Sequence, residues 1–308
     1  MAGQSKPFYY CSDLSRRSAE QTFGTASIGA VWLLLEYPHG WGRHALEDSA
    51  LSPAVKEFLR ATLAGIRHSR LLFVKTDRGR RDERMNLFVV RCREREPFIV
   101  RLQLKDYEDV RALDIASIAR GLDLQGGELT TEPLHLVCTH GRRDKCCAKF
   151  GVPVYNALRE CEGENVWQSS HVGGDRFAAN VVCFPHGLFY AHADEGAARR
   201  VVSEYRAGRV VTEKFRGRAC YPGFTQAAEF FARAESGLAE LDALRFRSSA
   251  PEGPSAWRVR FVEEGARRTH ELLVASRASE FRNFITCHSE EERAVPQFAL
   301  EDYRLLPL

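Results

Sequence analysis

The strongest constraint on the fold is an order of apolar segments that occurs twice along the 308-residue chain. The first half contains, in order, a strand pattern at 30–35, helical spacing at 53–66, a strand at 70–75, a hairpin at 86–91 and 97–102, and a helix at 107–113. The apolar runs are of strand length and the helical stretch has one apolar face. This alternation predicts helices packed on a sheet.

The second half repeats that order. It contains a strand at 134–137, a helix at 152–160, a short strand at 166–167, a hairpin at 180–184 and 188–191, and a helix at 195–205. The shared order is that of a thioredoxin-like half, in which parallel and antiparallel strand pairs are mixed. We therefore predict an α/β fold, with α+β mixed sheets, built from tandem thioredoxin-like halves.

The remainder of the chain predicts a smaller unit. It has a helix at 226–241, a loop at 248–255 and strands at 257–262 and 269–274. We predict a small C-terminal α+β module without a chemical motif. The expected domains are 1–127 for the first half, 128–210 for the second, and 211–308 for the C-terminal helix and module.

Three thiols follow the first strand of the second half. This strand ends at Cys138, and the next helix is expected near Pro153, so Cys146 and Cys147 are expected in a loop with Cys138. Ligands of α/β proteins bind at the carboxyl ends of strands. Thiolates and imidazoles are suitable donors for zinc or iron–sulfur centres. The spacing differs from that of a zinc finger.

A second polar loop lies between residues 171 and 180. It offers His171 and Asp175, and Gly173-Gly174 between them allows the backbone to approach a bulky inorganic group. His140 is expected to support the site as a hydrogen-bond donor rather than as a ligand. The corresponding loop of the first half, at 36–42, has no cysteine, so the first half is expected to serve as a scaffold.

Composition limits the compartment and the partners. The chain has nine cysteines, and residues 1–6 lack the apolar core of a signal peptide, so we expect free thiols in a cytoplasmic protein. With 44 basic and 41 acidic residues, the charge gives little support for nucleic-acid binding. No apolar run approaches the ~18 residues of a membrane span. The cysteines expected to be structural are Cys11, Cys92, Cys161, Cys183, Cys220 and Cys287.

Three motifs carry a resemblance to a known family. They are Cys-Thr-His-x-x-Arg-Asp-x-x-Cys at 138–147, His-x-Gly-Gly-x-x-Phe-Ala-Ala-Asn at 171–180 and Pro-x-Gly-x-x-Tyr at 185–190. Together they resemble the sucrase/ferredoxin-like family, specifically over residues 130–235. That resemblance implies a thioredoxin-like ferredoxin domain at 128–210 with a [2Fe–2S] cluster. The first half, whose corresponding loop has no cysteine, is expected to be a degenerate thioredoxin-like domain at 1–127.

The resemblance also implies a set of ligands. In characterised eukaryotic relatives, two cysteines bind one iron and two histidines of an H-x-x-x-H segment bind the other. Cys138, Cys147 and His171 match three of these positions. Asp175 stands where the second histidine would be. The expected metal and cluster ligands are therefore Cys138, Cys147, His171 and Asp175, with Cys146 or a water as alternatives for the fourth.

Three functions are compatible with the sequence. The first is one-electron transfer by an iron–sulfur electron-transport protein. In that case the chain is expected to be an electron carrier rather than a stand-alone enzyme. The second is thiol–disulfide exchange by Cys138 with Cys146 or Cys147, although the usual C-x-x-C is absent. The third is a redox-inactive scaffold that binds a protein. For the first, we expect a redox partner protein whose surface could be acidic. Arg142, Arg143 and Arg176 are either a docking patch for that partner or a solvated face.

Overall fold

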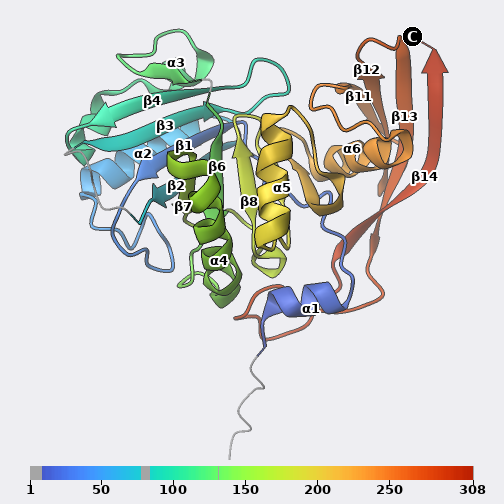
Figure 1. Cartoon of the computed structure of the whole chain (residues 1–308), viewed down its shortest axis with the longest axis horizontal. Coiled ribbons are helices and arrows are strands. Elements are labelled where there is room, and N and C mark those ends of the chain that lie inside the picture. Colours follow the sequence, from blue (N-terminus) through green and yellow to red (C-terminus); the bar gives the residue numbers. More distant parts are fainter. Residues whose placement is uncertain (1–8, 78–83, 131, 308) are drawn as a thin grey trace, which may run out of the picture.

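The computed structural model describes residues 9–77, 84–130 and 132–307, which form a mixed α/β structure with two sheets (Figure 1). The predicted α/β class is therefore confirmed. Residues 1–6, on which the expected lack of a signal peptide rests, lie outside the described residues. Within the described ranges, no helix has both the length and the apolar character needed to cross a bilayer.

The first half forms one side of the large sheet. Its strands are β1 (Val31–Glu36), β2 (Ser69–Lys75), β3 (Met85–Arg91), β4 (Phe98–Leu104) and β5 (Glu128–Thr130), and its helices are α2 (Pro53–Gly65), the 3₁₀ helix η1 (Tyr107–Ala112) and α3 (Ile115–Arg120). Strand β1 pairs parallel with β2 and antiparallel with β3. The hydroxyl of Ser52 accepts a hydrogen bond from Val55 N, which caps α2 where Pro53 begins the helix.

The second half has the same arrangement. Its strands are β6 (Leu134–Cys138), β7 (Val166–Ser169), β8 (Val181–Phe184), β9 (Leu188–Tyr190) and β10 (Phe215–Arg218), and its helices are α4 (Lys145–Glu162), α5 (Glu195–Arg206) and the short 3₁₀ helices η2 (Gly163–Asn165), η3 (Asp175–Phe177) and η4 (Thr212–Lys214). Strand β6 pairs parallel with β7 and antiparallel with β8, as β1 does with β2 and β3.

The two halves share one sheet. Its strand order is β10-β9-β8-β6-β7-β2-β1-β3-β4-β5, so the halves join where β2 pairs antiparallel with β7. They also share a core, in which the ring of Trp32 on β1 lies 5.5 Å from that of Phe184 on β8 and 5.9 Å from that of Phe189 on β9. Helices α4 and α5 lie together over the strands of the second half (Figure 1). The apolar face of β1 thus packs against the cysteine-bearing half.

The C-terminal region packs against the β10 edge of the large sheet. Helix α6 (Gly223–Ser236) lies against a sheet of β11 (Leu244–Pro251), β12 (Ala256–Glu263), β13 (Arg268–Ala278) and β14 (Pro296–Pro307). The helix ends before the expected residue 241 because Gly237 takes a left-handed conformation, with φ of 73°. The expected loop at 248–255 is partly strand, since β11 continues through residue 251.

Two elements differ from the sequence-based expectation in ways that matter for the cysteines. The helix expected near Pro153 begins eight residues earlier, at Lys145, because the carboxylate of Asp144 caps it by accepting a hydrogen bond from Cys146 N at 2.9 Å. Cys146 and Cys147 therefore lie in the first turn of α4 and not in a loop. The N-terminal residues form the unexpected helix α1 (Cys11–Arg17), which lies beside the C-terminal loop after β13 (Figure 1).

Candidate metal centre

Residues from three segments converge at the carboxyl end of β6. Cys138 is the last residue of β6, Cys147 is in the first turn of α4, and His171 follows β7. Donor atoms of these three residues all lie within 4.8 Å of one another. Asp175 Oδ1 lies 3.7 Å from Cys147 Sγ and 3.2 Å from His171 Nδ1. The structure thus brings together the four side chains that the sequence proposed as ligands.

A glycine in α4 sets the distance between the helix and the strand. A Cβ atom on Gly151 would lie 2.1 Å from the carbonyl oxygen of Cys138. Any larger residue would therefore collide with the backbone of the β6 terminus. The close approach places the first turn of α4, with Cys147, directly beside Cys138.

The loop that carries His171 and Asp175 is shaped by its glycine pair. Gly173 and Gly174 have φ of 95° and 81°, a region that residues with a Cβ rarely adopt. The buried guanidinium of Arg216 donates hydrogen bonds to Gly173 O and to Asn180 Oδ1, at 3.0 and 2.7 Å. Arg216 would also collide with a Cβ on Gly174. In the structure, the glycine pair therefore gives the loop its turn and leaves room for Arg216.

His140 fixes the position of His171 without joining the ligand group. Its Nδ1 accepts a hydrogen bond from His171 N at 3.1 Å, so its Nε2 carries the proton and donates to Gly42 O at 2.6 Å. Burial lowers the pKa of His140, which favours this neutral form. Gly42 belongs to the loop of the first half, so that half contacts the candidate site through this hydrogen bond.

Burial and mutual contacts shift the pKa values of all four side chains. A hydrogen bond with Cys147 holds the pKa of the Cys138 thiol well below its usual range, and His171 adds to this effect. The same bond and burial raise the pKa of Cys147. Burial opposes the charge on His171, but the hydrogen bond and charge of Cys138 outweigh it and raise the pKa of His171. Burial also raises the pKa of Asp175. A metal would therefore displace the Cys147 proton.

The adjacent Cys146 belongs to a different group. Its Sγ lies 3.6 Å from that of Cys11 in α1 and 3.3 Å from that of Cys287, in the loop between β13 and β14. The expectation that Cys146 shares one loop with Cys138 and Cys147 is thus wrong. Cys11 and Cys287, expected to be structural, are distant in sequence from every other thiol in their group and have no local motif, so sequence reasoning could not pair them.

Comparison with known families identifies one match. A family model described as sucrase/ferredoxin-like matches residues 22–217. No curated protein matches the chain, and no solved structure does. The matched region covers both halves of the large sheet and includes Cys138, Cys147 and His171, but it excludes Cys11 and Cys287.

Proposed function

Because the chain belongs to the sucrase/ferredoxin-like family, we propose that it is a thioredoxin-like ferredoxin that carries one electron on a [2Fe–2S] cluster. One observation supports this most directly. Two thiols and an imidazole, from segments that are separate in the sequence, converge at the end of β6 with a carboxylate beside them. Sulfur and nitrogen donors of this kind suit an iron–sulfur centre.

The strand arrangement supports the thioredoxin-like assignment. In the second half the order is β9-β8-β6-β7, with β6 and β7 parallel and β8 antiparallel to both of its neighbours. The first half has the corresponding order β4-β3-β1-β2. We propose residues 1–127 as the degenerate half, 128–210 as the ferredoxin half and 211–308 as the appended module.

Burial divides the ligand group into an inner and an outer part. Cys138 and Cys147 are 1% and 0% exposed, whereas the His171 side chain is 18% exposed. The two thiolates would hold the inner iron, and His171 with Asp175 the outer one. The bound cluster would supply reversible one-electron transfer. His171, the most exposed of the four side chains, would lie nearest to a partner at the surface.

The low pKa of Cys138 beside the Cys147 thiol favours one other function, thiol–disulfide exchange. Exchange requires that the attacking sulfur reach a substrate disulfide. Both sulfurs are buried, and Cys146 lies with Cys11 and Cys287. Burial therefore favours electron transfer over exchange.

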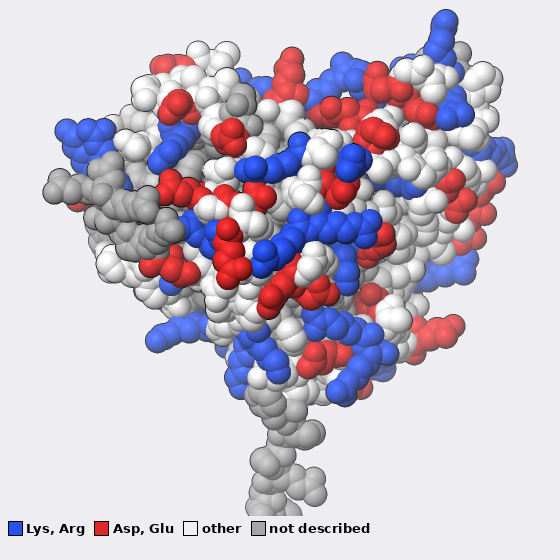
Figure 2. All heavy atoms as spheres, in the orientation of Figure 1, with Lys and Arg blue, Asp and Glu red and all other residues white. Residues whose placement is uncertain are grey.

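A pocket beside His171 suggests where the redox partner docks. It has a volume of about 270 Å³, and its lining includes Arg43, Arg143 and His171 together with one acidic residue, Glu47. The two arginines suit an acidic partner. Arg176, also expected to dock, instead pairs with Glu20 at 2.6 Å. Basic and acidic side chains are interspersed over the face drawn in Figure 2, so docking would depend on local charges beside His171.

The state of the thiols supports a cytoplasmic location. All nine cysteines are free, and most of them are buried. Free thiols persist in reducing compartments, whereas exported proteins tend to form disulfides. We therefore propose a cytoplasmic location.

Metal analysis tests the proposal. Protein purified without oxygen is expected to contain about two irons and two sulfides per chain, to absorb visible light and to give an EPR signal when reduced. Iron and sulfide assays, absorption and EPR on the same sample measure these properties. A colourless chain without iron, even after reconstitution with iron and sulfide, would show that this site does not hold a cluster.

Replacing Asp175 with histidine is expected to retain the cluster and raise its reduction potential. A carboxylate ligand adds a negative charge, which stabilises the ferric state, whereas a neutral imidazole does so less. A redox titration followed by absorption measures the shift. The control is Asp123→His, which changes an exposed aspartate. An Asp175→His variant with the spectrum and potential of the unmodified protein would show that Asp175 does not bind iron.

A further inference from the structure

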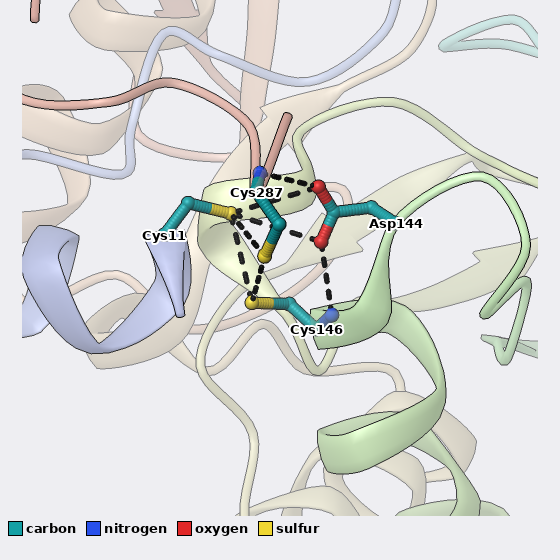
Figure 3. Close-up of side chains that lie close together, drawn as sticks. All are labelled: Cys11, Asp144, Cys146 and Cys287. Atoms are coloured by element: carbon teal, nitrogen blue, oxygen red, sulfur yellow. Dashed lines mark hydrogen bonds between the residues drawn. The ribbon is translucent and has the colours of Figure 1, made fainter. Parts of the chain in front are cut away.

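Three cysteines and an aspartate from three distant parts of the chain meet below the first turn of α4 (Figure 3). Cys11 comes from α1, Asp144 and Cys146 from the start of α4, and Cys287 from the loop between β13 and β14. Their donor atoms all lie within 4.8 Å of one another. This group shares no residue with the ligands at the end of β6.

The distances match those around a single tetrahedral ion. Zinc binds thiolate sulfur at about 2.3 Å, which places two sulfurs of one tetrahedron about 3.8 Å apart. The Sγ atoms of the three cysteines are separated by 3.6, 3.3 and 3.7 Å. Cys11 Sγ lies 3.8 Å from Asp144 Oδ1. A disulfide would need two sulfurs about 2.05 Å apart.

Backbone groups hold these side chains in place. Ser12 N donates a hydrogen bond to Cys146 Sγ at 3.4 Å, and Cys287 N donates to Asp144 Oδ2 at 2.7 Å. The rings of Tyr9 and Phe284 stack with centroids 4.4 Å apart, which joins the start of α1 to the Cys287 loop. These contacts join the three segments that carry the group.

We propose that Cys11, Cys146 and Cys287, with one carboxylate oxygen of Asp144, bind a zinc ion that is separate from the iron–sulfur cluster. Three thiolates and a carboxylate supply the four ligands of a closed structural site. The thiols lose their protons to solvent when the ion binds. This site does not depend on the proposed electron transfer.

The ion would clamp α1 over the cluster loop. Ser12 Oγ and Arg16 Nη2 both donate hydrogen bonds to Ala178 O, at 2.6 and 2.9 Å, just after Asp175. The ion would also fix Cys146, which precedes the cluster ligand Cys147. Zinc would thus hold both sides of the cluster site in position.

Zinc content of three variants tests the site. The full-length chain, purified without oxygen and exposed to Zn²⁺, is expected to hold about one zinc that resists dialysis. Cys11→Ser and Cys287→Ser are expected to lose it, whereas Cys161→Ser, which changes an exposed thiol on α4, is expected to keep it. Elemental analysis measures zinc and iron together, and circular dichroism checks folding.

Two further measurements separate this proposal from the cluster. Cys138→Ser is expected to lose iron and keep zinc, so zinc that disappears in Cys138→Ser would place the ion at the other site and overturn the proposal. A zinc chelator is expected to lower the Tm of the unmodified chain but not that of Cys11→Ser. Failure of the anaerobic chain to take up Zn²⁺, or a Cys146–Cys287 disulfide in it by mass spectrometry, would also overturn the proposal.

Discussion

Replacing Cys147 with serine is expected to abolish the cluster, whereas replacing its neighbour Cys146 is expected to abolish zinc binding. The two sulfurs lie in different groups, because Cys147 faces His171 and Asp175 and Cys146 faces Cys11 and Cys287. Loss of a thiolate from either group removes a quarter of its ligands. Iron, sulfide and zinc assays on both anaerobic variants measure the two losses separately.

The exposed thiol of the same helix supplies the control for this pair. Cys161→Ser is expected to keep both metals, since Cys161 lies in neither group. If Cys146→Ser lost its iron while Cys147→Ser retained it, the ligand assignment at the end of β6 would be reversed.

Replacing Glu229 with glutamine is expected to destabilise the protein by about 3–5 kcal/mol. Glu229 on α6 lies between two buried arginines, and its Oε1 accepts hydrogen bonds from Arg218 at 2.8 Å and Arg233 at 3.1 Å. Glutamine keeps the shape but leaves both guanidinium groups without a counter-charge. Thermal unfolding measures the change, expected as a Tm lower by roughly 10 °C.

The matched control is an ion pair at the surface. Glu213→Gln removes the partner of Arg200, and both side chains are more than half exposed, so no measurable loss is expected. A Glu229→Gln variant as stable as this control would show that the buried network contributes little.

The effect of Glu229→Gln should also depend on pH. Burial raises the pKa of Glu229, but the charges of Arg218 and Arg233 outweigh it and hold that pKa below its usual range. The stabilisation is therefore complete above the unfolded value of about 4.3 and is lost as the pH falls through the folded value. The difference between the two proteins is expected to shrink in acid.

The sequence predicted most strands of the large sheet because they are continuous apolar runs. The segment at 30–35 corresponds to β1, all of whose residues are buried, and the hairpin at 86–102 corresponds to β3 and β4. Periodicity cannot show which strands become neighbours, so the pairing of β2 with β7, which joins the halves, was not predicted.

The start of α4 was missed for a local reason. Pro153 suggested a first helical turn, since proline is favoured there, but the structure has it inside the helix. The helix instead begins directly after Asp144, whose carboxylate caps it. The motif nevertheless located Cys138, Cys147 and His171, because their spacing is carried by the family pattern and does not depend on the helix boundary.

The second group of thiols has a consequence for the order of synthesis. The proposed cluster ligands all lie between residues 138 and 175, so they leave the ribosome well before the chain is complete. The proposed zinc ligands extend from residue 11 to residue 287, so that site can close only after residue 287 has emerged. Cluster insertion could therefore precede closure of α1 over the loop, and zinc uptake would follow it.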